Sequence, residues 1–322
     1  MGGRYLARKM LQAIITIAFI VLLNFLLFRL MPGSPDRVLA RNLPLDVRQV
    51  LLERWGLDRP VFPDQFVAYV GATLQGDLGD SFKFQGVSVV DVLAGRIWPT
   101  LLLFGLGEVL AIIIGLGLGA YSGWKRGGPV DYVGNGISLI LYSMPYFVIG
   151  MILLMVLSGG LGWFPTSGML EMGATYSSFV DQLLDFLAHL ALPLTTVAIG
   201  LIGQYSILMR ASIIETLGED YVTTARAKGL TEGYILRRHA LPNAMLPAVT
   251  LVAINLGYVI AGAITVELVF GWPGLGTLTV EALNSRDYPV LQGVFLLLSI
   301  SVVLANFAAD LLYGFLDPRV RS

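Results

Sequence analysis

Residues 99–121 read PTLLLFGLGEVLAIIIGLGLGAY, an apolar run whose only ionisable side chain is Glu108. A helix rises about 1.5 Å per residue, so a run of this length can cross the roughly 30 Å hydrocarbon core of a bilayer. Five further runs are comparable in length and composition. We therefore predict an all-α integral membrane protein with about six transmembrane helices. The other five runs are residues 10–30, 133–157, 187–208, 246–270 and 290–313.

The composition supports a membrane location. Of the 322 residues, 56% are apolar and only 13% are charged, and the mean hydropathy is +0.75. A soluble domain of this size could not bury so much apolar surface in one core. The first run is longer than the apolar part of a secretory signal and ends in Arg29, Met31 and Pro32 without a small-residue cleavage site, so we interpret it as a retained helix.

Positive charge in the connections predicts the orientation. Residues 122–132, 209–245 and the C-terminal tail carry Lys and Arg, whereas residues 158–186 carry none and residues 271–289 carry only Arg286. Both termini are therefore expected in the cytoplasm. The expected organisation is a first helix in residues 1–30, an extracytoplasmic element in 31–98 with a helical stretch near 47–55, a core in 99–313 with a cytoplasmic loop at 209–245, and a cytoplasmic tail in 314–322.

Residues inside the runs have mainly structural interpretations. Gly115 and Gly119 have the spacing that lets two membrane helices approach closely, with Gly105 and Gly107 one to two turns earlier. Ionisable residues in a span are functional candidates by default. We nevertheless favour structural contacts over substrate contact for Glu108, Asn255, Glu267, Asn306 and Asp310. Glu108, Asn255 and Asn306 are expected to bond neighbouring helices. Glu267 and Asp310 lie near the ends of the runs, where water or interface contacts can satisfy them.

The cytoplasmic segment is the most informative about function. From Ala211 it reads ASIIETLGEDYVTTARAKGLTEGYILRRHALPNAMLP. Two short helical patterns flank Gly229, where a residue without a Cβ lets the chain reverse sharply. Pro242 is expected to stop the second pattern, because proline cannot continue helix hydrogen bonding. The alternative interpretation is an amphipathic loop resting on the membrane surface.

This segment resembles the EAA loop of binding-protein-dependent ABC importers. That pattern is Glu-Ala-Ala, three residues, Gly, nine residues, and Ile-x-Leu-Pro. The spacing fits throughout, although Thr replaces the Glu and the first Ala, and His replaces Ile. The matching positions, which the resemblance implies couple the chain to an ATPase, are Thr223, Thr224, Ala225, Gly229, His239, Leu241 and Pro242.

The flanking sequence is similar to the B-type permeases of the dipeptide, oligopeptide and nickel importer family. The resemblance rests on several motifs in order, and it implies a type I ABC importer permease fold in a bacterial or archaeal cell membrane. It also implies a second related permease, two ATP-binding subunits and an extracytoplasmic substrate-binding protein. The motifs are Arg4-Tyr5-Leu6, residues 31–35 (MPGSP), 56–60 (GLDRP), 76–81 (GDLGDS), Val266-Glu267, 273–276 (PGLG), 286–289 (RDYP) and 316–319 (LDPR).

The sequence lacks motifs for chemistry of its own. A phosphate-binding loop needs a Gly-Lys pair, and the chain has none. There is no His-Glu-x-x-His zinc motif and no Gly-x-Ser-x-Gly nucleophile motif, and His189 has a packing interpretation. We predict a permease subunit that is not an enzyme, needs no cofactor or metal and binds no nucleic acid. Peptides are the expected substrates, with nickel, glutathione-like compounds and oligosaccharides as alternatives. The alternatives from other classes are an ion-coupled secondary transporter and an intramembrane enzyme.

Overall fold

The computed structural model describes residues 3–30, 59–84, 86–259 and 264–316. Within these residues the structure is helical, and extended pairing is limited to an isolated bridge between Asp80 and Ser88. The chain divides into two compact units, Met1–Trp98 with Gly274–Ser322, and Pro99–Pro273. The predicted helical stretch at 47–55 and the motif at 31–35 lie outside the described residues, as do residues 56–58 and 317–322.

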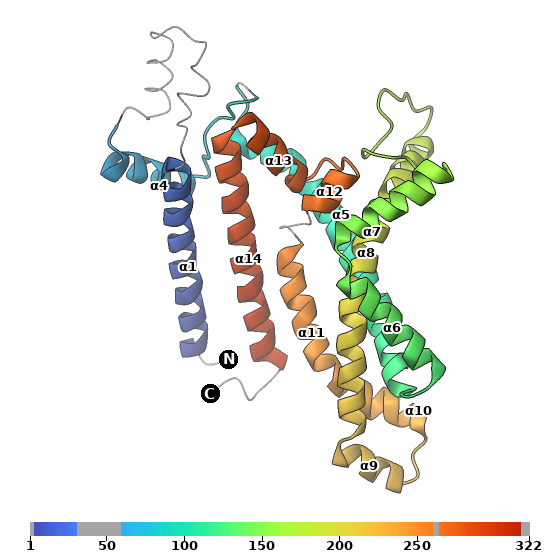
Figure 1. The fold of residues 1–322 in the computed structure, drawn as a ribbon. Helices are drawn as coiled ribbons and strands as arrows, with labels where there is room; N and C mark the ends of the chain where they lie inside the picture. Colours follow the sequence, from blue (N-terminus) through green and yellow to red (C-terminus); the bar gives the residue numbers. More distant parts are fainter. Residues whose placement is uncertain (1–2, 31–58, 85, 260–263, 317–322) are drawn as a thin grey trace. The chain divides into compact units, whose positions relative to one another are not determined.

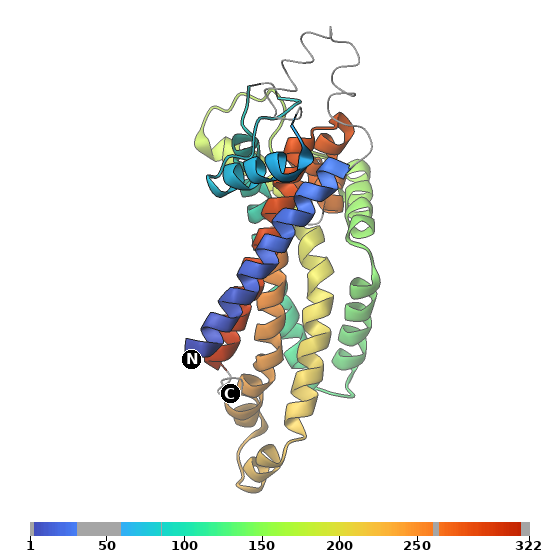
Figure 2. The ribbon, with the colours of Figure 1, turned by 90° about the vertical axis from the view of Figure 1, so that its left-hand side faces the viewer.

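The first unit is built on an antiparallel pair of long helices, α1 (Gly3–Leu30) and α14 (Tyr288–Leu316) (Figures 1 and 2). Lys9 Nζ lies 2.7 Å from Asp310 Oδ2 near one end of the pair. Asn24 Nδ2 donates to the Gln292 carbonyl oxygen, 3.0 Å away, near the other end. The Asp310 carboxylate on α14 is thus paired with a lysine of the neighbouring helix α1. The unit also contains η2 (Val61–Gln65), α4 (Phe66–Leu74), the start of α5 (Val89–Trp124) and α13 (Leu275–Ser285).

A buried carboxylate anchors a loop in this unit. Asp287, which follows α13, accepts hydrogen bonds from Ser81 Oγ at 2.5 Å and from the backbone N–H of Phe82 at 3.0 Å. The backbone N–H of Lys83 donates to the same carboxylate at 3.1 Å. Two motifs of the sequence, residues 76–81 and 286–289, therefore meet in space although about 200 residues separate them.

The second unit is organised around α8 (Phe179–Leu217), against which α6 (Pro129–Ser143), α7 (Tyr146–Leu153) and α11 (Leu241–Tyr258) pack (Figures 1 and 2). The remaining elements are η3 (Leu154–Gly160), α9 (Asp220–Ala227), α10 (Glu232–Ile235), η4 (Leu236–Ala240) and α12 (Ile264–Val269). A buried cluster that includes Leu103, Val197, Phe270 and Trp272 forms the core at the α12 end.

Close helix contact depends on glycines of α5, as their spacing predicts. A Cβ at Gly115 would lie 2.9 Å from the carbonyl oxygen of Ile202 on α8. A Cβ at Gly119 would meet the carbonyl oxygen of Ser206, one turn further along α8. Gly107 similarly faces Val197, whereas Gly105 meets nothing within 4 Å. The glycines on one face of α5 therefore allow the backbone of α5 to pack directly against α8.

Five described helices are long and apolar enough to cross a membrane, and a bent pair brings the number to six if it counts as one span. That agrees with the predicted number. The bent pair corrects the predicted continuous run at 133–157, because α6 and the α7–η3 helix meet at 102°. Met144 is extended (φ −85°, ψ 130°), as expected for the residue before Pro145.

The run at 246–270 is also not one helix. The chain forms α11, which ends at Tyr258, and a separate α12 from Ile264 to Val269. α12 is fixed by its own buried contacts, because Thr100 Oγ1 donates to Glu267 Oε1 at 2.7 Å. Glu267 is fully buried, so the expectation that it would be satisfied by water or the interface is wrong.

Two predicted boundaries also shift. α5 begins at Val89, so the last ten residues of the expected element at 31–98 belong to a membrane helix. The expected loop at 209–245 is helical at both ends, because α8 continues to Leu217 and α11 starts at Leu241.

Candidate coupling hairpin

The segment between α8 and α11 folds into a helical hairpin, α9–Gly229–α10, which lies beyond one end of α8 and α11 (Figures 1 and 2). α9 begins after Glu219, which is extended, and carries Asp220 in its first turn and Arg226 in its last turn. These charges oppose the partial charges of the helix ends. The 3.2 Å hydrogen bond from the Thr223 N–H to the Glu219 carbonyl oxygen belongs to this first turn.

Gly229 makes the reversal. Its φ is +78°, a left-handed conformation that side chains with a Cβ rarely adopt. The Gly229 N–H donates to the Arg226 carbonyl oxygen at 2.9 Å, and the Leu230 N–H donates to the Ala225 carbonyl oxygen at 3.3 Å. A Cβ at Gly229 would meet nothing within 4 Å, so the backbone conformation, and not a lack of space, favours glycine here.

A small apolar core holds the two arms together. Val222, Ala225 and Ile235 are buried, and Leu217 at the end of α8 packs against them. Ala225 is therefore the small residue through which α9 contacts the rest of the hairpin. Thr223 and Thr224 are exposed, and Thr224 Oγ1 donates to the Asp220 carbonyl oxygen at 2.9 Å. The three residues that match Glu-Ala-Ala thus divide into one core position and two surface positions.

Polar contacts close the hairpin across the turn. Arg226 pairs with Glu232 through two hydrogen bonds, Nε to Oε1 at 2.8 Å and Nη2 to Oε2 at 3.2 Å. This pairing raises the pKa of the Arg226 guanidinium, so the pair is charged at every physiological pH. Both side chains are largely exposed, which makes the pair a weak contributor to stability and a geometric link between α9 and α10.

The last predicted positions join the hairpin to the membrane helix. The His239 carbonyl oxygen accepts from Asn243 Nδ2 at 2.8 Å, and the His239 ring lies 5.8 Å from the Tyr234 ring. Leu241 packs against a buried cluster that includes Met209 and Ala244. The structure brings Ala225 into the hairpin core and Leu241 into this separate cluster, and it leaves Thr223, Thr224 and Pro242 on the surface.

Pro242 does not stop the second helix, contrary to the prediction. It occupies the first turn of α11, and the chain passes from η4 into α11 with helical backbone angles at Leu241 (φ −57°, ψ −46°). η4 is a π turn, in which the Leu241 N–H donates to the Leu236 carbonyl oxygen. Proline is tolerated in the first turn of a helix, where an N–H is not needed.

The surface of the hairpin carries both apolar and basic side chains. Tyr221, Leu230 and Tyr234 are exposed, as are four basic residues. The surface is suited to docking against a protein, since aromatic residues and arginines are enriched at interfaces. The exposed basic residues are Arg226, Lys228, Arg237 and Arg238.

One ion pair near the hairpin was not predicted. Buried Asp131, at the start of α6, accepts from Arg210 of α8 through Nε at 2.5 Å and Nη2 at 3.0 Å. Ser122 Oγ and the Gly127 N–H complete the carboxylate's hydrogen bonds at 2.7 and 2.9 Å. In the sequence Arg210 belongs to the segment 209–245, whose Lys and Arg predict the orientation, and no local pattern relates it to Asp131. The available signal was an acidic residue two positions after Pro129, in the first turn of a helix.

The intramembrane Glu108 is also paired. It is buried, and its carboxylate accepts a hydrogen bond from the Tyr205 hydroxyl of α8. Asn255 Nδ2 of α11 donates to the same hydroxyl oxygen at 3.0 Å. Glu108 and Asn255 therefore link α5, α8 and α11, as the structural interpretation of these residues predicts, whereas Asn306 is exposed.

Comparison with known proteins gives the chain a family. A family model described as "Binding-protein-dependent transport system inner membrane component" matches residues 112–322. The dipeptide transport system permease protein DppB of Escherichia coli K12 is 36% identical over 339 residues, which cover 99% of this chain and 98% of that protein. The oligopeptide transport system permease protein AppB of Bacillus subtilis is 34% identical over 317 residues, 98% of each chain.

A solved structure shares the fold. The inward-facing MetNI methionine ABC transporter contains a chain with a TM-score of 0.56, 20% identity, and coverage of 71% of this chain and 97% of that chain. This likeness concerns the fold alone, and it confirms the predicted all-α importer permease fold. The permease relatives likewise confirm the prediction of a permease subunit that is not itself an enzyme.

Proposed function

We propose a peptide-importing role for this chain, which belongs to the family of binding-protein-dependent transport system inner membrane components. The permease would form, with a second related permease, a pathway for di- or oligopeptides delivered by an extracytoplasmic binding protein. The observation that carries the proposal is full-length similarity to permeases named for dipeptide and oligopeptide transport. Nickel, glutathione-like compounds and oligosaccharides are the alternative substrates within the same importer class.

The hairpin α9–Gly229–α10 is the proposed contact with the ATP-binding subunits. Its exposed apolar side chains Tyr221, Leu230 and Tyr234 would dock in a groove of such a subunit. The rigid arms behind it support a mechanical role. α8 has 39 residues, about 58 Å at 1.5 Å per residue, and ends where the hairpin begins.

The second arm is also continuous. From Glu232 the chain is helical through η4 into α11, and it qualifies as a membrane span to Leu256. A push on the hairpin would therefore reach α8 and α11 directly. In the proposed cycle, ATP-driven closure of two ATP-binding subunits moves the hairpins of both permeases, and the helix bundles switch from inward-open to outward-open.

This role requires the hairpin and both termini to lie in the cytoplasm. The four basic residues of the hairpin support that orientation, because Lys and Arg accumulate on the cytoplasmic side of membrane proteins. Residues 31–98 would then be extracytoplasmic up to the start of α5, and residues 314–322 cytoplasmic. The chain would reside in the cell membrane of a bacterium or archaeon.

Substitution of Gly229 tests the coupling role in the importer reconstituted with its partner subunits. Gly229→Val is expected to impair ATP-driven dipeptide uptake severely while the ATP-binding subunits continue to hydrolyse ATP, since valine strains the left-handed turn. Gly229→Asn is the matched control, because asparagine tolerates that conformation, and it should retain most of the uptake.

Normal uptake by Gly229→Val would contradict the coupling role. Competition experiments on the complete importer distinguish the candidate substrates. Dipeptides are expected to compete with the uptake of a labelled dipeptide, whereas nickel ions, glutathione and an oligosaccharide are not. Uptake by the purified chain alone, driven by an ion gradient, would instead identify the ion-coupled secondary transporter.

A further inference from the structure

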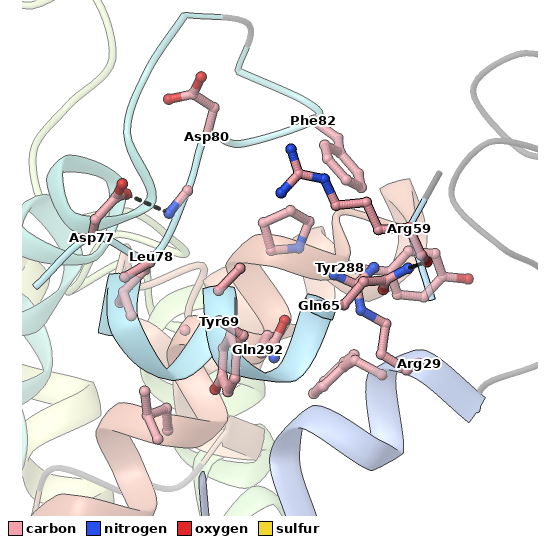
Figure 3. A pocket seen from close by; sticks show the side chains of 17 residues that line it. Arg29, Arg59, Gln65, Tyr69, Asp77, Leu78, Asp80, Phe82, Tyr288 and Gln292 are labelled. Atoms are coloured by element: carbon pink, nitrogen blue, oxygen red, sulfur yellow. Dashed lines mark hydrogen bonds between the residues drawn. The ribbon is translucent and has the colours of Figure 1, made fainter. Parts of the chain in front are cut away.

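The helix α4 lies across the end of α1 (Figures 1 and 3). The Phe66 ring lies 5.3 Å from the Phe25 ring, and Asn24 Nδ2 lies 3.3 Å from the Tyr69 hydroxyl. Asn24 precedes Leu30, the last residue of this membrane helix, by six residues, or about 9 Å along the axis. The contacts of α4 are therefore at the depth of the bilayer interface and not beyond the end of the span.

The outer face of α4 is apolar and exposed. Its nine residues, FVAYVGATL, contain no charged side chain. Val67 and Leu74 are seven residues apart and share one face, with 64% and 83% of their surface exposed. Val61 and Phe62 of η2 are exposed next to it in the sequence. Apolar exposure of this extent at the end of a membrane span indicates a surface that lipid or another protein covers.

A cavity of about 430 Å³ borders α4 on the side of Ala68 and Ala72. Figure 3 shows the side chains of Arg29, from α1, and Arg59, which precedes η2, reaching into it. Arg29 comes from the last turn of a membrane helix, where long basic side chains extend toward the headgroups. Guanidinium groups bind phosphate oxygens in a forked geometry.

We propose that α4 is an interfacial helix and that the adjacent cavity holds the headgroup phosphate of a phospholipid through Arg29 and Arg59. Acyl chains of the surrounding bilayer cover Val67 and Leu74, which lie on another face of α4. Under the proposed orientation this lipid belongs to the outer leaflet, and the inference depends on the membrane position of α1 and not on the peptide-importing role.

The charges around the cavity favour a lipid over a free anion. Asp77 and Asp80 also line it and offset the two arginines, and Asp77 Oδ1 accepts from the Gly79 N–H at 2.8 Å. A small anion would gain little net attraction there. A phospholipid adds contacts between its acyl chains and the apolar surface of α4, which an inorganic anion lacks.

Spin labelling tests the position of α4. The chain has no cysteine, so single cysteines can be placed without background. In the complete importer, in vesicles of equal parts phosphatidylglycerol and phosphatidylcholine, a nitroxide at Val67→Cys should collide with oxygen more than with an aqueous nickel chelate. The label at Asp64→Cys, on an exposed polar position of η2, should show the reverse. Chelate access at Val67 equal to that at Asp64, or no access by either reagent, would overturn the interfacial assignment.

Native mass spectrometry of the same importer tests the phosphate site. The Arg29→Gln/Arg59→Gln double variant should retain phosphatidylglycerol about tenfold less than the native protein, because two charge-assisted bonds are lost. The matched Arg29→Lys/Arg59→Lys variant keeps the charge and should retain intermediate amounts. Unchanged retention in the Gln variant would refute the site, and displacement of the lipid by millimolar inorganic phosphate would identify a free-anion site instead. If the Gln variant fails to assemble, lipid retention by the Lys variant still tests the site. Reduced retention supports the site, unchanged retention refutes it, and displacement of the lipid by inorganic phosphate identifies a free-anion site.

Discussion

Asp131 at the start of α6 and Arg210 on α8 form a forked ion pair, with both guanidinium contacts within 3.0 Å. Arg210 lies seven residues before the end of α8, where the candidate coupling hairpin begins. The pair thus fixes the turn between α5 and α6 to the helix that would carry movement of the hairpin. The carboxylate is buried, whereas the arginine is about one-quarter exposed.

Asp131→Asn should destabilise the assembled importer by about 1–3 kcal/mol, because Arg210 loses its charged partner and one of the two acceptor oxygens becomes an NH2 donor, while the size of the side chain is kept. Thermal unfolding in detergent measures this change. Asp181→Asn, at an exposed position in the first turn of α8, is the control and should shift stability by less than about 0.5 kcal/mol. Equal effects of the two substitutions would show that the ion pair is dispensable.

Alanine substitutions at two glycines of α5, Gly117 and Gly119, should have opposite effects on stability. Gly119→Ala places a Cβ against the Ser206 carbonyl oxygen and Met209, and should cost about 1–3 kcal/mol of stability through overpacking. Gly117→Ala meets nothing within 4 Å and should be neutral or slightly stabilising, since alanine favours a helix. Thermal unfolding of both variants checks this, and a tolerated Gly119→Ala would mean that α5 and α8 are not packed so closely.

Glu108→Gln should leave stability and uptake nearly unchanged, because the amide oxygen still accepts from the Tyr205 hydroxyl. Glu108→Leu removes the acceptor and should cost about 1–3 kcal/mol by leaving a buried hydroxyl unsatisfied. Uptake and unfolding of both variants provide the measurement. Loss of uptake in Glu108→Gln with normal stability would assign a transport role to the carboxyl group itself.

The connection between η3 and α8, residues 161–178, should become more accessible to protease above about pH 10. The Tyr176 hydroxyl donates to Asp185 Oδ2 at 2.6 Å, and this bond raises the pKa of Tyr176 above its usual value of about 10. A raised folded-state pKa means that the contribution is complete below pH 10 and is lost as pH rises through the folded value. Proteolysis of residues 161–178 should therefore accelerate above pH 10.

Tyr176→Phe serves as the comparison for this alkaline transition. It should show fast proteolysis already at pH 8 and no further acceleration near pH 10, because it lacks the titrating hydroxyl. A native protein that is cleaved at the same rate from pH 8 to pH 11 would exclude this role of the Tyr176 bond.

The membrane class, a number of spans near six and a turn at Gly229 can all be predicted from the sequence. Those features are local, since apolar length decides membrane partition and a positive φ favours a residue without a Cβ. The two helical patterns around Gly229 were recognisable for the same reason. Even the break at Pro145 had a local signal, because proline disfavours helix at the preceding residue.

Which distant polar groups meet depends on how the helices pack. Arg210 lies 79 residues from Asp131, Tyr205 lies 97 residues from Glu108 and Phe82 lies 205 residues from Asp287, and no local pattern relates these pairs. The position of Pro242 also became clear only in the folded chain. Pro242 does not end a helix, because the π turn η4 before it leads directly into α11. Long-range partners are fixed only when packing brings helices together, because a buried polar group must find an acceptor or donor wherever the folded chain provides one.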